Sequence, residues 1–504
     1  MIRAAGVLMP ISSLPSAHGF GTMGKAAREF VDFLADSGQT YWQMLPLGPT
    51  GFGNSPYQCL SSYAGNPYFI DLDELKEDGL LTAAELKKAV MFKTEDEADY
   101  GLLYKERIPL LRKACARLPH LAPEDYFTFL EEEKHWVKDY AVFMAIKQAQ
   151  KGKAWVSWPE DMRIHDSQAV REAAAENREE VVFWLRVQYL FYKQLNALKV
   201  YCEKKGIRVI GDLPFYVASD SVDVWSHPEQ FEMKSDHTMA YVSGMPVDGA
   251  NPEGQKWGNP LFDWNRMRSE GYRWWLDRAM HQFRFCDVLR IDHFRGYQSY
   301  FAVPADGHPK DGRFEQGPGL ELFRKLDERS GKRPLLLEDL GHLTPDFLAM
   351  VRESGYPGMR ILQYAFDPND PGSLYMPFQY DHNTAAYTGT HDNNTLKGWY
   401  EDKNEKKRIE RAKKYFGAHN DDDLTDVFLR GLYGSVSDLA IVPMQDLLGL
   451  GSEARFNDPS GNGVPWTWRM LKGSVSKSLT AKLKEMMLLY CRNNWEANKD
   501  ENAM

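Results

Sequence analysis

The feature that most restricts the fold of this chain is a set of short apolar runs that each end in an acid. Residues 288–291, for example, contain Arg290 and pass directly into Asp292. Burying a carboxylate is costly unless it has firm partners or a function. Several apolar strands with acids at their C-terminal ends therefore indicate one site assembled from parallel strands, as in a (β/α)8 barrel. The acids placed in this way are Asp212, Asp292, Glu338 and Asp392.

Eight candidate strands can be read along the chain, and helical patterns separate most of them. Apolar spacing predicts helices over residues 25–37 and 180–205, and each of these ranges is followed by a glycine, which commonly ends a helix. This alternation favours a parallel sheet, so we predict an α/β protein with a (β/α)8 TIM barrel. The predicted strands are residues 6–9, 40–45, 208–212, 287–292, 335–338, 359–364, 385–390 and 439–444.

The length of 504 residues is compatible with a single catalytic domain over residues 1–504, built as a barrel with insertions. Residues from about 53 to 205 are too many for a simple crossover, and their charged, helical pattern predicts a helical insertion. Residues 243–263 are rich in loop-forming residues and predict a second insertion in the cleft. Beyond position 450 about 504 − 450 = 54 residues remain, with a helix predicted over 474–494, so we expect no separate C-terminal β-domain.

Charge and cysteine content exclude several classes of protein. The formal net charge of −10 argues against nucleic acid as a partner, because phosphate binding needs a basic face. The five cysteines are scattered without a CxxC pair, and the sequence has neither EF-hand spacing nor a histidine pair at i, i+4. We therefore expect no metal and no other cofactor. Because no signal peptide or membrane-spanning run is recognised, we expect a cytoplasmic protein without a membrane partner.

The grouped acids indicate a particular chemistry. Carboxylates that lie with a few hydrogen-bond donors, and without a metal cluster, are typical of enzymes that cleave glycosidic bonds. A single Asp at a strand end is more often a helix cap or a turn residue. Four acids in barrel order, with Arg290 two residues before Asp292 and a histidine directly before Asp392, favour a catalytic site instead. Loop aromatics such as Trp257 and Trp466 would suit the flat faces of sugars.

Motifs along nearly the whole chain resemble those of the 4-α-glucanotransferases, also called amylomaltases or disproportionating enzymes. These enzymes form glycoside hydrolase family 77 in the α-amylase superfamily of retaining barrels. Any one of the motifs is weakly specific, but all of them in order at barrel-like intervals are highly specific. The matching segments are residues 41–50, 55–58, 64–68, 211–217, 254–260, 290–296, 338–341, 388–394 and 446–449.

The resemblance implies roles for the acids and their neighbours. Asp292 would be the nucleophile that forms a β-linked glucosyl-enzyme, and Glu338 would be the general acid and base. Asp392 would hold hydroxyl groups of the donor sugar and favour its distorted ring. Arg290 would orient Asp292, and His391 would bond the same sugar as Asp392.

The resemblance also implies a wider set of substrate-binding residues. Three assignments have structural alternatives: Trp257 could be a core residue, Tyr57 could pack on the following turn, and His391 could cap its strand. The implied residues are Asp212 at the third strand, Ser55 and Tyr57 on the acceptor side, Asp248, Gln255, Trp257 and Asn259 in the cleft wall, and Glu453, Arg455 and Asn457 in a late loop. The implied donors are α-1,4-glucans and malto-oligosaccharides, and the implied acceptors are glucose or malto-oligosaccharides.

One stretch departs from the family pattern. Where relatives usually have two prolines, an acid and one or two bulky residues, residues 246–252 read Pro-Val-Asp-Gly-Ala-Asn-Pro. In relatives this loop covers the bound glucan and helps to exclude water. Its smaller side chains here leave the preferred donor length and the ratio of transfer to hydrolysis open.

Two alternatives to transfer follow from the same residues. Transfer and hydrolysis share one glucosyl-enzyme, so a hydrolytic α-amylase or α-glucosidase is the alternative enzyme. The acceptor-side pattern at residues 55–57 and the missing β-domain that classical amylases append favour transfer. A catalytically inactive glucan-binding scaffold is the alternative from a different class, but the intact acids argue against it because a binding protein needs no acid/base pair.

Overall fold

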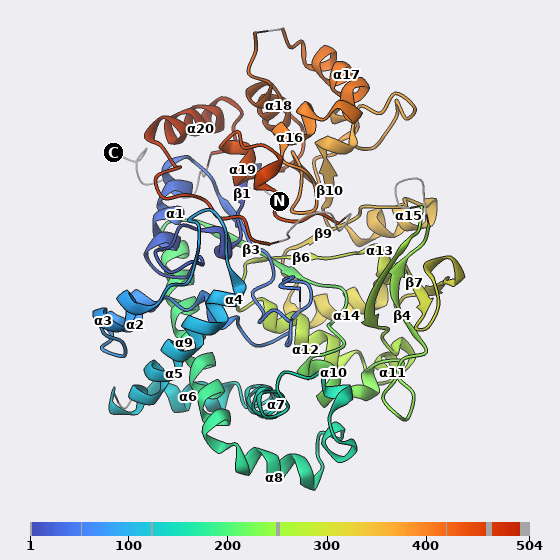
Figure 1. Cartoon of the computed structure of the whole chain (residues 1–504). Helices are drawn as coiled ribbons and strands as arrows, with labels where there is room; N and C mark the ends of the chain where they lie inside the picture. Colours follow the sequence, from blue (N-terminus) through green and yellow to red (C-terminus); the bar gives the residue numbers. More distant parts are fainter. Residues whose placement is uncertain are drawn as a thin grey trace.

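A closed barrel of eight parallel strands lies at the centre of the molecule (Figure 1). The computed structural model describes residues 3–51, 53–121, 124–247, 252–419, 421–459 and 466–493. Each barrel strand overlaps one predicted strand, which confirms the predicted fold. In barrel order the strands are β1 (Ala4–Leu8), β12 (Leu439–Pro443), β11 (Thr384–Tyr387), β10 (Gly358–Ile361), β9 (Leu335–Leu337), β6 (Val288–Ile291), β3 (Arg208–Leu213) and β2 (Tyr41–Gln43).

The strand register brings the acids to one edge of the barrel. β3, β6 and β9 are neighbours, and Asp212 of β3 pairs with Arg290 of β6. The last residues of β6 and β9 pair with each other in turn. Asp292 directly follows β6, and Glu338 directly follows β9. The two acids therefore lie next to each other at the same end of the barrel.

The barrel strands are buried on both faces, which explains why they read as continuous apolar runs in the sequence. Gly6 allows β1 to approach β2, because a Cβ atom at this position would lie 2.5 Å from the carbonyl oxygen of Tyr41. Alternate strand positions fill the barrel interior with one apolar cluster. Its members include Leu8, Ile210, Val288, Leu336, Met359, Ile361, Tyr387 and Ile441.

Helices surround the barrel. Between β2 and β3 the elements of the described ranges are helical, and the long α9 returns to the barrel and packs against α1 and α7. None of the helices in the described ranges is long and apolar enough to cross a membrane. The helices up to β3 are α1 (Lys25–Asp36), α2 (Leu72–Glu77), α3 (Ala83–Lys88), α4 (Tyr100–Leu102), α5 (Ile108–Arg117), α6 (Glu124–Glu132), α7 (Val137–Ala149), α8 (Gln168–Glu176) and α9 (Arg178–Lys204).

The remaining helices follow the later strands, and in Figure 1 the group α16, α17 and α18 lies at the top of the view. The predicted terminal helix over residues 474–494 is observed as α20. These helices are α10 (Val222–Ser226), α11 (Trp264–Ser269), α12 (Arg273–Gln282), α13 (Arg295–Gln298), α14 (Leu320–Ser330), α15 (Pro345–Ser354), α16 (Leu396–Glu401), α17 (Lys406–Phe416), α18 (Leu424–Tyr433), α19 (Met444–Leu447) and α20 (Lys477–Leu489).

A second, antiparallel sheet flanks the barrel, on the right in Figure 1, and it was not predicted. Its strand order is β5 (Gln255–Pro260), β4 (Tyr241–Met245), β7 (Ser299–Pro304) and β8 (Arg313–Gln316). The expectation of a loop-rich stretch over residues 243–263 is therefore corrected, because most of β4 and all of β5 lie there. This sheet lies beside the barrel edge that carries the acids, because the ring of Trp257 in β5 is 5.4 Å from that of His293, centroid to centroid.

Two arginines near the limits of the described residues bind backbone carbonyl groups of segments that are distant in the sequence. Arg3 donates a hydrogen bond of 3.0 Å to the carbonyl oxygen of Tyr433. Arg492, which follows α20 and is fully buried, donates to the carbonyl oxygen of Ala4 in β1 and to that of Ser437 before β12, each at 2.9 Å. The segment after α20 therefore fastens together β1 and β12, the strands at which the barrel closes.

Candidate active site

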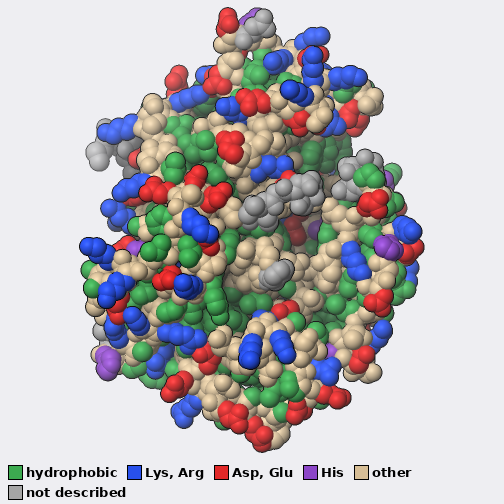
Figure 2. All heavy atoms as spheres, viewed as in Figure 1, with side chains coloured by type: hydrophobic (Ala, Val, Ile, Leu, Met, Phe, Trp, Pro, Cys, Tyr) green, Lys and Arg blue, Asp and Glu red, His purple; other side chains and the backbone are tan. Residues whose placement is uncertain are grey.

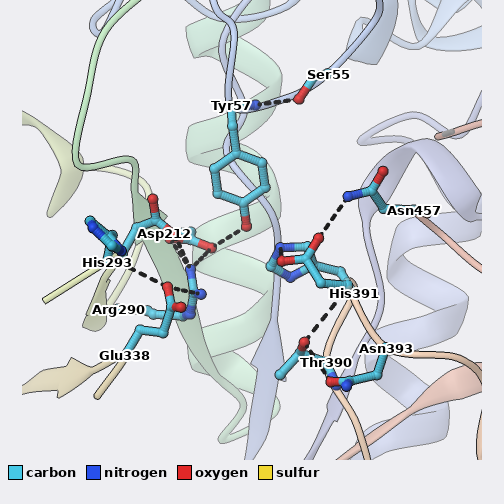
Figure 3. A network of polar contacts seen from close by, with 12 residues as sticks. Ser55, Tyr57, Asp212, Arg290, His293, Glu338, Thr390, His391, Asn393 and Asn457 are labelled. Atoms are coloured by element: carbon cyan, nitrogen blue, oxygen red, sulfur yellow. Dashed lines mark hydrogen bonds and ion pairs between the residues drawn. The ribbon is translucent and has the colours of Figure 1, made fainter. Parts of the chain in front are cut away.

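Arg290 lies at the centre of a charged cluster at the C-terminal end of the barrel strands (Figure 3). Its Nη1 donates to both carboxylate oxygens of Asp212, at 2.7 and 2.6 Å, and to Oδ1 of Asp292 at 3.2 Å. Its Nη2 donates to Oε2 of Glu338 at 2.8 Å. Although burial opposes its charge, the surrounding carboxylates raise the pKa of Arg290 well above its usual value. One cation thus joins carboxylates from β3, β6 and β9.

The carboxyl group of Glu338 is held so that it favours the protonated form. Its Oε2 accepts hydrogen bonds from Arg290 and from the backbone N–H of His293, the latter at 2.9 Å. Burial and the negative charge of Asp292 nevertheless raise the pKa of Glu338 well above its usual value, outweighing the opposing effects of Arg290 and His293. A carboxylic acid whose pKa is raised in this way holds its proton to a higher pH and can serve as a proton donor.

Asp292 is held by two donors and remains partly open to the solvent. Its Oδ1 accepts from Arg290, and its Oδ2 accepts from the backbone N–H of Phe215 at 3.2 Å. Phe215 lies just after β3, so the neighbouring strand orients this carboxylate. The Asp292 side chain is 21% exposed, compared with 3% for Arg290. A ligand can therefore reach the oxygens of Asp292 while Arg290 stays buried beneath them.

Tyr57 connects Asp212 to His391. Its hydroxyl group donates to Oδ2 of Asp212 at 2.7 Å, and its ring stacks on the imidazole of His391 with centroids 5.0 Å apart. Ser55 supports this arrangement, because its Oγ accepts from the backbone N–H of Tyr57 at 3.2 Å. Burial raises the pKa of Asp212, which Arg290 and Tyr57 oppose. Tyr57 thus packs on His391, and the two rings form one wall of the site.

Asp392 is held by His391 and by the loop that contains Arg455 and Asn457. Its Oδ2 lies 3.2 Å from Nε2 of His391, and its Oδ1 accepts from Nδ2 of Asn457 at 2.6 Å. Arg455 donates to its backbone carbonyl oxygen at 3.3 Å. Although the surrounding protein limits hydration, His391 and Asn457 hold the pKa of Asp392 well below its usual value. With 45% of its side chain exposed, this carboxylate is available to a ligand.

The residues predicted for the cleft wall on β5 have different roles. Trp257 is half-buried, and its Nε1 donates to Oε1 of Gln255 at 2.8 Å. Asn259 is only 4% exposed, and its Nδ2 donates to the carbonyl oxygen of Val217 at 2.9 Å. Its Nδ2 also donates to Oε1 of Gln58 at 3.3 Å, so the amide of Asn259 helps to hold β5 in place, and its contact with a substrate stays a prediction.

Of the predicted binding residues, Glu453 is not brought into contact with the acids, and Asp248 cannot be placed. Glu453 is exposed, and its Oε1 accepts from the backbone N–H of Gly451 at 2.9 Å, within its own turn. Asp248 lies outside the described residues, as do Gly249 and Ala250 of the departing loop. The roles proposed for Asp248 and for this loop therefore stay predictions.

Two backbone groups at the site were not predicted from the sequence, and the loop aromatic Trp466 was given no partner there. The backbone N–H groups of Phe215 and His293 bind Asp292 and Glu338, and no side-chain pattern reveals them. Trp466 lies 5.9 Å from His391, centroid to centroid. Its place in an aromatic-rich loop was the only signal for it in the sequence.

Among the described residues, one further group combines side chains that could bind a metal ion. Ligand atoms of Glu133, His135 and His281 lie within 4.8 Å of one another. Glu133 is already ion-paired with Arg284, and Nε2 of His281 lies 2.7 Å from the hydroxyl group of Tyr192. The resident arginine disfavours a divalent cation at this place, and none of the barrel-edge acids belongs to the group.

The arrangement suits cleavage of a glycosidic bond by two carboxyl groups. A hollow opens near the middle of the face shown in Figure 2, and acidic side chains are visible inside it. Asp292 is open to a ligand and paired with a cation, whereas Glu338 beside it favours its protonated form. A nucleophile next to a proton donor is the pair that retaining glycosidases use. Asp392 and His391 add further hydrogen-bonding groups at the same edge.

Comparisons with known proteins agree with this chemistry. A family model described as 4-alpha-glucanotransferase matches residues 9–474. The 4-alpha-glucanotransferase of Clostridium butyricum is 40% identical over 96% of this chain and 100% of the relative. That of Thermus thermophilus is 40% identical over 96% of this chain and 98% of the relative. An amylomaltase from Streptococcus agalactiae, solved in complex with acarbose, superposes with a TM-score of 0.94 at 37% identity, covering 97% of this chain and 100% of that one.

Proposed function

This chain belongs to the 4-alpha-glucanotransferase family, and we propose that Asp292 and Glu338 carry out its transfer reaction by a double displacement. The substrates are α-1,4-glucans and malto-oligosaccharides, which serve as donors, with glucose or malto-oligosaccharides as acceptors. The observation that carries the proposal is the guanidinium of Arg290, which contacts both carboxyl groups at 3.2 and 2.8 Å. It orients a nucleophile and an acid against the same bond.

In the first step Asp292 would attack the donor. One of its carboxylate oxygens bonds to C1 of the glucose unit while the bond from C1 to the leaving O4 breaks. The proton of Glu338 moves to that O4, which leaves as the free end of the departing fragment. The products are a β-glucosyl ester on Asp292 and a Glu338 carboxylate next to Arg290. The raised pKa of Glu338 supports this role, because the acid must still hold its proton when the donor binds.

In the second step an acceptor sugar would take the glucan from the enzyme. The 4-OH of the acceptor gives its proton to Glu338 as its oxygen bonds to C1. The ester bond to Asp292 breaks, so the glucan carries a new α-1,4 linkage and both carboxyl groups return to their starting forms. Two displacements at C1 retain the α configuration.

The remaining polar groups would hold the sugar at the cleavage point. Asp392 offers a carboxylate that is 45% exposed and flanked by His391. Carboxylate bonds to ring hydroxyls strengthen as positive charge develops at C1 in the transition state. Tyr57 would contact the acceptor side, and its bond to Asp212 ties the helical insertion to the barrel. This contact supports the assignment of the chain to one catalytic domain.

A cytoplasmic location is also part of the proposal. All five cysteines are unpaired, and Cys491 is exposed. Free thiols persist in a reducing compartment and become oxidised outside it.

With maltotriose as the only sugar, we expect glucose and a ladder of longer malto-oligosaccharides. Each transfer breaks one linkage and makes another, so the total number of reducing ends stays constant while the ladder grows. Hydrolysis would add one reducing end for every bond broken. Chromatography of the products, with a reducing-end assay on the same samples, separates the two reactions. Glucose and maltose without longer products, and with rising reducing ends, would rule out transfer.

The rate should fall on the alkaline side at a pH well above the usual pKa of a glutamic acid. The reason is that burial and Asp292 raise the pKa of Glu338. As the pH rises through this raised pKa, Glu338 loses the proton that it must donate, so kcat/KM declines. Measurement of kcat/KM for maltotriose across the pH range tests this. A decline that begins near pH 4–5, about the value of a free glutamic acid, contradicts it.

A further inference from the structure

The residue after the proposed nucleophile has an unusual backbone. His293 has a φ angle of 44°, in the left-handed region that residues other than glycine rarely adopt. Such a conformation persists only where the surrounding structure enforces it, and it is often found at functional sites. The chain leaves β6 at Asp292, turns at His293 and enters α13 two residues later.

This turn directs two consecutive N–H groups at Glu338. The N–H of His293 donates to the side-chain Oε2 of Glu338 at 2.9 Å. The N–H of Phe294 donates to the backbone carbonyl oxygen of Glu338 at 3.1 Å. Glu338 is thus held at both its side chain and its main chain by one turn, in addition to the contact from Arg290.

The surroundings of His293 show how the turn is maintained. Its imidazole makes edge contacts with Trp257 and Phe215, at centroid distances of 5.4 and 5.7 Å. Gly296 leaves room for this packing, because a Cβ atom there would lie 2.8 Å from Cζ of Phe215 and 2.9 Å from Cδ2 of His293. The ring contacts offset the backbone strain and keep the turn in place.

We propose that His293 is a positioning residue for the acid/base, and that its left-handed backbone, more than its imidazole, holds Glu338 in line with the scissile bond. The inference rests on the proposed function, since it assumes that Glu338 is the proton donor. In this proposal the strained turn at position 293 keeps one backbone N–H group directed at the carboxyl group of Glu338 through both displacement steps.

The electrostatic setting allows the backbone effect to be isolated. Burial lowers the pKa of His293 and so disfavours its charged form, and all the replacements below are neutral. The charged or titratable groups that face Glu338 are Arg290 and Asp292 from β6, and Tyr364 and Tyr375 from the segment after β10. None of them changes in the variants below.

Three substitutions separate the backbone from the side chain. Asparagine adopts the left-handed region readily, and glycine does so without any side chain. Leucine has as many side-chain heavy atoms as asparagine but disfavours this region by roughly 1–2 kcal/mol. His293→Asn and His293→Leu therefore form a matched pair, and His293→Gly tests removal of the ring alone.

We expect His293→Leu to have a kcat/KM for maltotriose about ten-fold below that of His293→Asn. This factor corresponds to the free-energy cost of a left-handed backbone conformation at a leucine. The alkaline limb of its pH profile should move to higher pH, because the N–H bond that favours ionised Glu338 is weakened. Release of fluoride from α-maltosyl fluoride should differ less between the two variants, since fluoride leaves without protonation. His293→Gly should follow the asparagine variant.

Two results would overturn the inference. Equal losses in the asparagine, glycine and leucine variants would assign the effect to the imidazole. A lower melting temperature for the leucine variant, with an unchanged pH profile and an unchanged ratio between the two donors, would assign it to stability alone. The variant Glu338→Gln distinguishes these from failure of the proposed function: if it cleaves maltotriose at the normal rate, Glu338 is not the acid, whatever the position-293 series shows.

Discussion

Asp292→Asn should lower the turnover of maltotriose by a factor of thousands or more, because covalent catalysis supplies a large part of the rate. An amide oxygen is a far weaker nucleophile than a carboxylate, so the glucosyl ester does not form at a useful rate. The amide keeps the size of the side chain and can still accept from the N–H of Phe215. We therefore expect the variant to fold, and initial rates together with a melting curve test both statements.

A matched control and a trapping experiment sharpen this result. Asp306 is exposed in the turn after β7, so Asp306→Asn should keep the normal rate. In Glu338→Gln, α-maltosyl fluoride should glycosylate Asp292 without acid assistance, and the ester should then persist because no base activates the acceptor. Mass spectrometry should find the added sugar on the peptide that contains Asp292. A near-normal rate for Asp292→Asn, or a label on another residue, would show that the nucleophile is a different group.

Arg290→Met should damage both stability and activity. The change leaves the carboxyl groups of Asp212, Asp292 and Glu338 close together without the cation that joins them. Removal of one partner from a buried ion pair costs about 3–5 kcal/mol of folding free energy. We also expect kcat to fall by about 10²–10³, as when a preorganised donor is lost from an active site. Urea unfolding and maltotriose kinetics measure the two effects.

Arg360→Met is the matched control for Arg290→Met. Arg360 of β10 forms a similarly enclosed ion pair, in which its Nη1 donates to Asp339 at 3.0 Å, and the pair contains none of the proposed catalytic groups. Its loss should lower stability to a similar degree but reduce kcat much less. If Arg290→Met retains kcat within about ten-fold of normal, the arginine is a structural residue and the electrostatic role assigned to it is wrong.

The barrel could be predicted from the sequence because its strands are covered on both faces. A strand such as β12, with every residue buried, must be apolar throughout, and this leaves a clear run in the sequence. The edge strands of the second sheet lack such a signal, although its central strand β7 is largely buried. Its edge strand β8 reads Arg-Phe-Glu-Gln and is largely exposed, and its other edge, β5, contains glycine and proline. Edge strands of this kind are polar and irregular, which hides them from an analysis of hydrophobic periodicity.

The site could be predicted only as far as side chains define it. The acids at strand ends were identified because carboxylates are out of place after apolar runs, and the structure brings Asp212, Asp292 and Glu338 to one guanidinium. The backbone donors to these acids depend on φ angles and on register, which residue types do not reveal. The bond from Asn259 to the carbonyl oxygen of Val217 likewise depends on the backbone conformation, so the sequence did not reveal it.

The bonds from Arg492 to the carbonyl oxygens beside β1 and β12 have a consequence for how the protein is made. β1 leaves the ribosome 439 − 8 = 431 residues before its neighbour β12, and the arginine that fastens the two strands follows later still. At about 5–20 residues per second, synthesis of the residues between β1 and β12 takes roughly 20 seconds or more. Throughout that time the edge of β1 that β12 will cover is unpaired, because β2 pairs with the other edge, so the nascent chain depends on a chaperone or on other contacts to keep this edge from pairing with other molecules.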